Sequence, residues 1–125
     1  MKKIDDVRIS KYMWRSESMC QCDRCSEAVV INPKLLSILD EVREFFGYPL
    51  VSHCMVRCIE HNQEEGGTEN SRHLPKHADA CDFHIQTVEH SLVYAYLTAQ
   101  YGDEIGVHEY SWGIHLDTRG YRARW

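Results

Sequence analysis

Two short segments of this sequence alternate between apolar and polar residues, and the polar positions of both include a histidine and an aspartate. Residues 80–85, Ala-Cys-Asp-Phe-His-Ile, predict a strand that turns Asp82 away from its apolar side. Residues 113–117 predict another strand, in which His115 and Asp117 share a face. The residues predicted to point into the core are Cys81, Phe83, Ile85, Ile114 and Leu116. The fold must therefore bury one face of each strand and leave the ionisable face open.

Two helices are expected to cover such a sheet. Asn32 is a good N-cap, a proline follows at the first helical position, and apolar residues continue at helical spacing until Gly47 stops the helix. A second helix is expected over residues 88–101, with Thr87 as its cap and Gly102 after its last turn.

The remaining segments complete the expected architecture. Residues 49–52 resemble a strand that enters the core, residues 61–71 a polar loop, and residues 105–121 a strand pair joined by a turn. Residues 1–31 are expected to form an irregular lead-in with a short helix. The sequence therefore predicts an α+β fold, with a small and mostly antiparallel sheet flanked by helices, in a single domain that spans residues 1–125.

Charge and hydropathy exclude several classes of partner. Fourteen Lys and Arg against nineteen Asp and Glu give a formal net charge of −5, which argues against nucleic acid as the main partner. No apolar run approaches the roughly 20 residues that span a bilayer, and the charged opening of the chain does not continue into an apolar stretch. We therefore expect a protein that is cytoplasmic as synthesised, has no signal peptide and does not bind a membrane. A monomer is expected as well, although charge and hydropathy do not determine the oligomeric state.

The spacing of histidines and aspartates is suited to a catalytic metal. His73 lies in a predicted loop, and Asp82 and His115 lie on two predicted strands. Two imidazoles and one carboxylate match the three protein ligands of a catalytic zinc ion, which leaves one position for water. Zinc lowers the pKa of bound water to near neutrality and polarises a carbonyl oxygen, a combination suited to amide hydrolysis.

The same residues resemble a known family. The pairs Ser71-x-His73, Ala80-x-Asp82 and His115-x-Asp117 match, in order and spacing, the zinc D-alanyl-D-alanine carboxypeptidases and phage endolysin peptidases, which are related in fold to the hedgehog signalling domain. Further matches are Asn32-Pro33, Arg57-Cys58, His61-Asn62, Gly66-Gly67, Asn70 and residues 117–120. The resemblance implies a hedgehog/DD-peptidase-like fold with one catalytic zinc ion held by His73, Asp82 and His115.

The resemblance also assigns roles around the metal. It implies that Arg57 binds a substrate carboxylate or the developing oxyanion and that Ser71 positions substrate. Family members often carry an acidic general base three residues before the last zinc histidine, and here that residue is Trp112. Glu109, six residues before His115, is the leading substitute, and Asp117 is the alternative, although it is also suited to orienting ligands or substrate.

One further departure concerns the ligands themselves. The interval from His73 to Asp82 is two residues longer than the commonest family spacing and lacks the usual glycine. His77 lies within this longer segment and is a rival metal ligand.

The resemblance implies a zinc metallopeptidase that hydrolyses a peptide bond in the stem peptide of bacterial peptidoglycan. Either a D-Ala-D-Ala carboxypeptidase or an endolysin-type endopeptidase is consistent with it, and such an enzyme would reach the cell wall on lysis. A different class stays open because the usual acid is replaced by Trp112. This alternative is a non-catalytic, zinc-bearing binding module on the same fold.

Six cysteines are numerous for a chain of this length. Cys20, Cys22 and Cys25 lie close together and could bind a second, structural zinc ion with one distant thiol. Buried thiols suit Cys58 and Cys81, and a disulfide could form if the protein acts outside the cell. A cysteine nucleophile is disfavoured because no thiol lies in a recognisable Cys-His setting.

Overall fold

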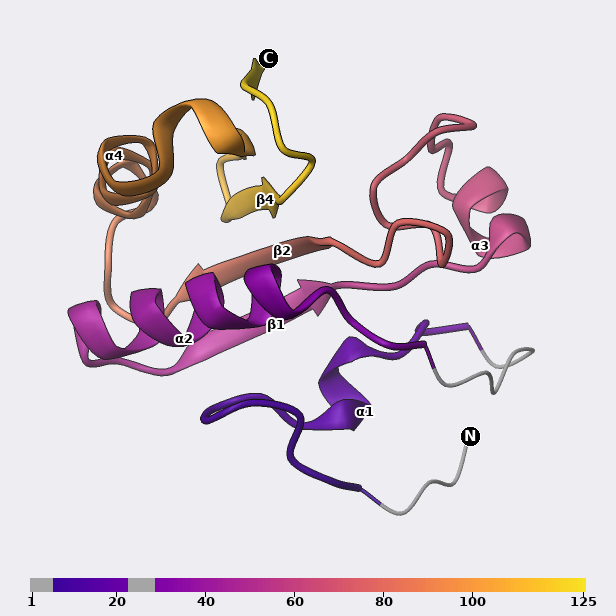
Figure 1. Cartoon of the computed structure of the whole chain (residues 1–125), viewed down its shortest axis with the longest axis horizontal. Coiled ribbons are helices and arrows are strands. Elements are labelled where there is room, and N and C mark those ends of the chain that lie inside the picture. The colour runs from indigo at the N-terminus through magenta and orange to yellow at the C-terminus, as the bar shows by residue number, and fades with distance from the viewer. Residues whose placement is uncertain (1–5, 23–28) are drawn as a thin grey trace.

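The computed structural model describes residues 6–22 and 29–125. Cys25, one of the cysteines assigned to the second metal, lies outside the described residues. The elements in chain order are α1 (Arg15–Ser18), α2 (Pro33–Phe46), β1 (Leu50–Cys54), α3 (Ile59–Glu64), β2 (Ala80–Ile85), α4 (His90–Tyr101), the 3₁₀ helix η1 (Gly102–Glu104), β3 (Gly106–Glu109), β4 (Ile114–Asp117) and β5 (Ala123–Arg124) (Figure 1).

The five strands form one mixed sheet in the order β1-β2-β4-β3-β5. Three of the four strand pairs are antiparallel, and β5 alone runs parallel to its neighbour β3. The predicted α+β class with a mostly antiparallel sheet is therefore confirmed. The register sets Asp82 opposite His115 across β2 and β4, and a bulge in β1 sets Cys54 opposite Asp82 on the other side. Polar side chains from three strands thus share one face.

The start and end of α2 follow the sequence signals closely. The side chain of Asn32 accepts hydrogen bonds from the backbone N–H groups of Lys34 and Leu35, at 2.8 and 3.4 Å. At the other end, Gly47 adopts a left-handed conformation with φ of 75° and donates its N–H to the Arg43 carbonyl. The predicted helix boundaries are therefore confirmed.

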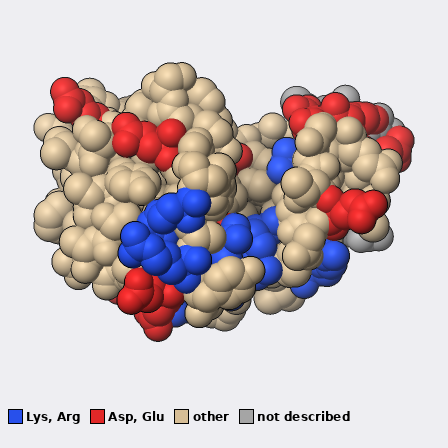
Figure 2. Space-filling model, turned by 90° about the horizontal axis from the view of Figure 1, so that it is seen from above, with Lys and Arg blue, Asp and Glu red and all other residues tan. Residues whose placement is uncertain are grey.

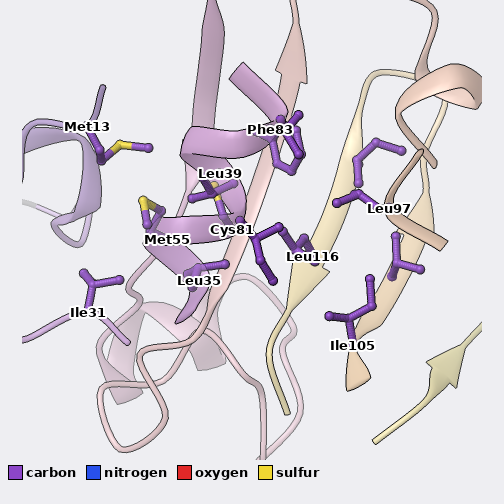
Figure 3. Packing of buried hydrophobic residues seen from close by; sticks show 14 of the residues in the cluster. Met13, Ile31, Leu35, Leu39, Met55, Cys81, Phe83, Leu97, Ile105 and Leu116 are labelled. Carbon is purple, nitrogen blue, oxygen red and sulfur yellow. The ribbon is translucent and has the colours of Figure 1, made fainter. Parts of the chain in front are cut away.

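The core lies on the sheet face opposite the polar side chains. Phe83 and Leu116 are fully buried between the strands and the apolar sides of α2 and α4 (Figure 3). Leu35 and Leu39 contribute from α2, as Figure 3 shows beside Cys81. The inward positions predicted from alternation are confirmed, because all of them are buried. In the described part of the chain, no helix has both the length and the apolar character needed to cross a bilayer.

Two local predictions were wrong, and one strand was not predicted. Residues 59–64 form α3, which overlaps the start of the expected loop (residues 61–71), because the Cys58 sulfur caps it by accepting the N–H of His61. Thr87 does not cap α4, since it occupies a tight turn with φ of 65° and the helix begins only at His90. β5 was not anticipated, because two residues of parallel pairing leave no periodic signal.

Candidate metal centre

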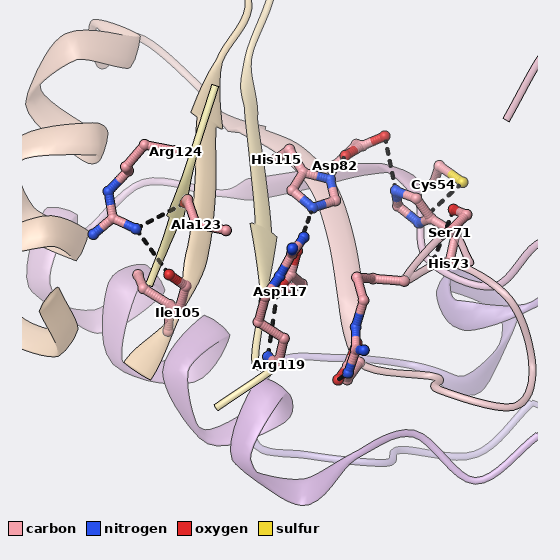
Figure 4. Close-up of polar contacts among 12 residues, drawn as sticks. Cys54, Ser71, His73, Asp82, Ile105, His115, Asp117, Arg119, Ala123 and Arg124 are labelled. Carbon is pink, nitrogen blue, oxygen red and sulfur yellow. Dashed lines mark hydrogen bonds and ion pairs between the residues drawn. The ribbon is translucent and has the colours of Figure 1, made fainter. Parts of the chain in front are cut away.

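The three predicted metal ligands converge on the polar face of the sheet. Asp82 lies between the two imidazoles: its Oδ2 is 3.2 Å from Nε2 of His73, and its Oδ1 is 2.8 Å from Nδ1 of His115 (Figure 4). The two histidine rings meet edge to face with centroids 5.2 Å apart. Residues from a loop and two strands, separated by up to 42 positions, thus direct one carboxylate and two ring nitrogens at one another.

The outward nitrogen of each imidazole is also engaged. Nδ1 of His73 lies 2.7 Å from the backbone carbonyl of Met55, and Nε2 of His115 lies 2.8 Å from Oδ2 of Asp117. Both outer partners are hydrogen-bond acceptors, so an imidazole that gives up one proton to a cation keeps the other on its outward nitrogen and offers its inward nitrogen as the ligand. Arg119 holds the carboxylate of Asp117 through two hydrogen bonds of 2.7 Å. The outer partners therefore prepare both histidines to bind a cation.

The electrostatics of the cluster follow from its burial and its hydrogen bonds. Burial alone raises the pKa of Asp82, but hydrogen bonds from His115 and His73 outweigh it and hold the pKa well below the usual range. Burial alone lowers the pKa of His73, yet its contacts with Asp82 and Cys54 raise it to about 9. A metal ion that binds His73 must displace a proton from the protonated ring. The apparent affinity of the cluster for the metal therefore rises with pH up to about 9.

A cleft of about 490 Å³ opens over these side chains. Lys and Arg side chains gather around the hollow at the centre of the surface in Figure 2, and the lining includes Arg57, Arg72 and Arg119. Asp82 supplies the single carboxylate among the described residues that line the cleft. The cleft therefore favours an anionic ligand, although the chain as a whole is acidic.

Arg57 differs from the other arginines of the cleft. Arg72 pairs with Asp79, and Arg119 pairs with Asp117. By contrast, a terminal nitrogen of Arg57 donates to the Ser71 hydroxyl at 3.3 Å, and its Nε is buried without an acceptor among the described residues. A buried donor without an acceptor is costly, so Arg57 is suited to receive an anionic group of a ligand.

Glu109, predicted as the general base, is not brought to this cluster. It is exposed at the end of β3 and pairs with Ile114 of β4, whose side chain lies in the core. Directly opposed residues in antiparallel strands share a face, so the register assigns Glu109 to the face opposite that of His115. His108, the preceding residue, is instead directly opposite His115 on the site face.

The other positions singled out by the sequence lie near the site but outside the ligand set. Asp117 is completely buried, and both of its oxygens are engaged by His115 and Arg119. Nε2 of His77, the rival ligand, lies 2.8 Å from Oδ1 of Asn70. Trp112 stacks on Tyr110 at a centroid distance of 4.8 Å.

Besides His108, three further residues near the site were given no role by sequence reasoning. Tyr110 and Trp125 both line the cleft, and the ring of Trp125 lies 5.1 Å from that of His115. Burial raises the pKa of the Tyr110 phenol, which therefore remains a hydrogen-bond donor at neutral pH. The Cys54 sulfur lies 3.6 Å from Nδ1 of His73, on the side of the ring that also faces Met55. Only the bulge in β1 brings Cys54 there, and no sequence pattern announces it.

The donor set fits zinc. Two imidazole nitrogens and a carboxylate are borderline and hard ligands that zinc accepts together, and outer acceptors that orient ligating histidines are usual at such sites. A metal-binding group of Cys54, His73 and Asp82 is also geometrically accessible, since their ligand atoms all lie within 4.8 Å of one another. The two histidines with Asp82 agree better with the ring orientations, because Cys54 faces the protonated nitrogen of His73.

Comparison with protein families identifies the class. The profile of the family described as Peptidase M15 matches residues 11–117, which include every residue of the cluster. The chain therefore belongs to the peptidase M15 family, whose members are zinc peptidases. No match was found among curated individual proteins.

The role of Asp117 can be tested by Asp117→Asn. The amide keeps the shape but removes the charge that fixes the proton on Nε2 of His115, so we expect zinc affinity to fall about 10- to 100-fold. Competition with a chromogenic chelator measures this, with circular dichroism as the control for folding. An unchanged zinc affinity in a folded variant would show that Asp117 does not orient His115.

Proposed function

We propose that this protein is a zinc metallopeptidase that hydrolyses a peptide bond in the stem peptide of bacterial peptidoglycan. The observation that carries this proposal is the convergence of His73, Asp82 and His115 at one side of an arginine-lined cleft. Membership of the peptidase M15 family supports the reaction class. The cationic lining supports a substrate that carries carboxylates, as wall stem peptides do.

In this proposal the chain's residues divide the work of hydrolysis. His73, Asp82 and His115 would hold zinc, which supplies Lewis acidity and lowers the pKa of bound water. In the zinc-bound form, Met55 and Asp117 would hold the remaining proton of each imidazole on its outer nitrogen and leave the inner nitrogen to the metal. Arg57, positioned by Ser71, would bind the substrate carboxylate or the developing oxyanion.

The proton acceptor is proposed from the geometry of β3. His108 lies on the site face directly opposite His115, and its Nδ1 contacts the backbone oxygen of Trp125. This contact keeps the proton on Nδ1 and leaves Nε2 as an acceptor. The ring of His108 stacks on that of Trp125 at 5.3 Å, and Trp125 in turn contacts His115. His108 is therefore the side chain of β3 on the site face that could accept a proton, whereas the register assigns Glu109 to the opposite face.

A zinc-bearing binding module that lacks catalysis is the second candidate. It is favoured by the absence of a second carboxylate among the described residues of the cleft, since many zinc peptidases use one as a base. Such a module would bind wall peptides through Arg57 and zinc without cleaving them. Activity assays separate the two candidates.

Defined wall peptides provide the direct assay. We expect the purified, zinc-loaded protein to cleave a stem peptide that ends in D-Ala-D-Ala or contains an internal D-residue bond, with products identified by mass. A chelator should abolish cleavage and added zinc should restore it. Tight binding of these peptides without any cleavage would favour the binding module.

The proton acceptor is tested with a matched pair of neighbouring substitutions. We expect His108→Gln to lower kcat about 100-fold with zinc still bound, and Glu109→Gln to leave kcat within about threefold, because general-base catalysis typically contributes factors of 10² to 10⁴. The opposite pattern, with Glu109→Gln inactive and His108→Gln active, would restore the role predicted for Glu109 from sequence.

The role of Arg57 is tested with two versions of one substrate. Loss of a charge-assisted hydrogen bond costs about 1.5–3 kcal/mol, so Arg57→Ala should raise KM about 10- to 100-fold for a peptide with a free C-terminal carboxylate. The same substitution should change KM little for the C-terminally amidated peptide. An equal increase in KM for both peptides would show that the terminal carboxylate is not the partner of Arg57 and would point to an endopeptidase.

A further inference from the structure

A second cluster of metal-binding side chains lies at the start of α3, apart from the centre described above. Ligand atoms of Cys20, Cys22 and His61 all lie within 4.8 Å of one another. Cys58, the N-cap of α3, adds a fourth donor because its sulfur is 3.7 Å from that of Cys22. The family resemblance includes Cys58 and His61 among its matching residues but assigns them no role. Neither residue belongs to the alternating strands.

The separations of three donor pairs, Cys20–Cys22, Cys20–His61 and Cys22–Cys58, are close to those of ligands around one ion. The Cys20 sulfur lies 3.5 Å from the Cys22 sulfur and 3.2 Å from Nδ1 of His61. Ligands at about 2.3 Å (sulfur) and about 2.0 Å (nitrogen) from a tetrahedral zinc lie about 3.8 Å apart for two sulfurs and about 3.6 Å apart for sulfur and nitrogen. The sulfur pairs are therefore far from the roughly 2.05 Å of a disulfide and close to the separations around zinc.

The surroundings of the cluster are also built for thiolates. The backbone N–H of Cys58 donates to the Cys20 sulfur, and that of His61 donates to the Cys58 sulfur, both at 3.4 Å. Nε2 of His61 lies 3.2 Å from a carboxylate oxygen of Glu65, so the proton is kept on Nε2 and Nδ1 faces the sulfurs. This repeats the arrangement by which Asp117 orients His115.

We propose that Cys20, Cys22, Cys58 and His61 bind a second zinc ion in a closed, structural Cys₃His site. Four protein ligands leave no position for substrate, so this ion stabilises the fold and takes no part in hydrolysis. The sequence suggested Cys20, Cys22 and Cys25 with one distant thiol, and the geometry now supplies two distant ligands, Cys58 and His61.

The ion would connect Cys20 and Cys22, which precede α2, to Cys58 and His61, which lie next to the cleft. The segment after α1 runs towards the side of the molecule that holds α3 (Figure 1), and the N–H of Val56 donates to the Ser18 carbonyl at 3.2 Å. Cys58 directly follows Arg57, which lines the cleft. A metal bound at Cys58 would therefore hold the backbone of Arg57 in place. This inference does not rest on the proposed hydrolytic function.

Metal content of matched variants tests the proposal. We expect two zinc ions per chain in the wild type and one in the double variant His73→Ala/His115→Ala. Cys58→Ser and His61→Ala should each retain one ion, whereas His77→Ala, a loop-histidine control outside both clusters, should retain two. Retention of both ions by Cys58→Ser and His61→Ala would overturn the site. Loss of the ion in Cys25→Ser with its retention in His61→Ala would overturn the assignment of His61.

A second measurement needs no substitution in the cysteine cluster and so does not depend on whether those variants fold. Cobalt substituted into His73→Ala/His115→Ala should show intense sulfur-to-cobalt charge-transfer absorption and the ligand-field bands of a tetrahedral ion. A thiol-specific mercurial should release one equivalent of zinc from the wild type. A bound cobalt ion without sulfur charge transfer, or a mercurial that releases no zinc, would contradict the proposal.

Discussion

The contact between the buried carboxylate of Asp117 and Nε2 of His115 decides how the rest of the centre is arranged. Because Asp117 accepts a hydrogen bond from the outer nitrogen, the inner nitrogen, which lies 2.8 Å from Asp82, is the one that a cation can take. Asp117 itself can be buried as a charge only because Arg119 neutralises it through two hydrogen bonds, which hold its pKa well below the usual range even though burial alone raises it. Without this chain of contacts, His115 would lie beside Asp82 without a defined orientation.

The segment between β1 and α3 connects the two clusters of candidate metal ligands. The Met55 carbonyl accepts a hydrogen bond from Nδ1 of His73, Arg57 lines the cleft, and Cys58 belongs to the second cluster. A backbone shift at Cys58 would thus also displace Arg57 and Met55, which lie only one and three residues before it. In both clusters a carboxylate contacts the outer nitrogen of a histidine and so directs the other ring nitrogen towards the remaining candidate ligands.

Much of this arrangement was predictable from sequence, because it depends on periodicity and local capping. Alternation identified which side chains of β2 and β4 face the core, and Asn32 and Gly47 marked the ends of α2. The convergence of His73, Asp82 and His115 follows from the adjacency of those two strands and the loop before them.

Register and non-standard caps could not be predicted. The one-residue difference between Glu109 and His108 assigns them to opposite faces, and only the pairing of β3 with β4 reveals it. The start of α3 could not be predicted, because its N-cap is a cysteine and the surrounding residues are polar. A role for His61 could not be predicted either, because it depends on the contact with Cys20 that α3 creates. These features depend on contacts between segments distant in sequence, for which a single sequence leaves no periodic trace.

The most direct test of the account is a crystal structure of the zinc-loaded protein with anomalous scattering recorded at the zinc edge. The account predicts an anomalous peak bonded to Nε2 of His73, a carboxylate oxygen of Asp82 and Nδ1 of His115, with a fourth position open to the cleft. A peak bonded to the Cys54 sulfur instead of His115, or no peak among these residues, would contradict it.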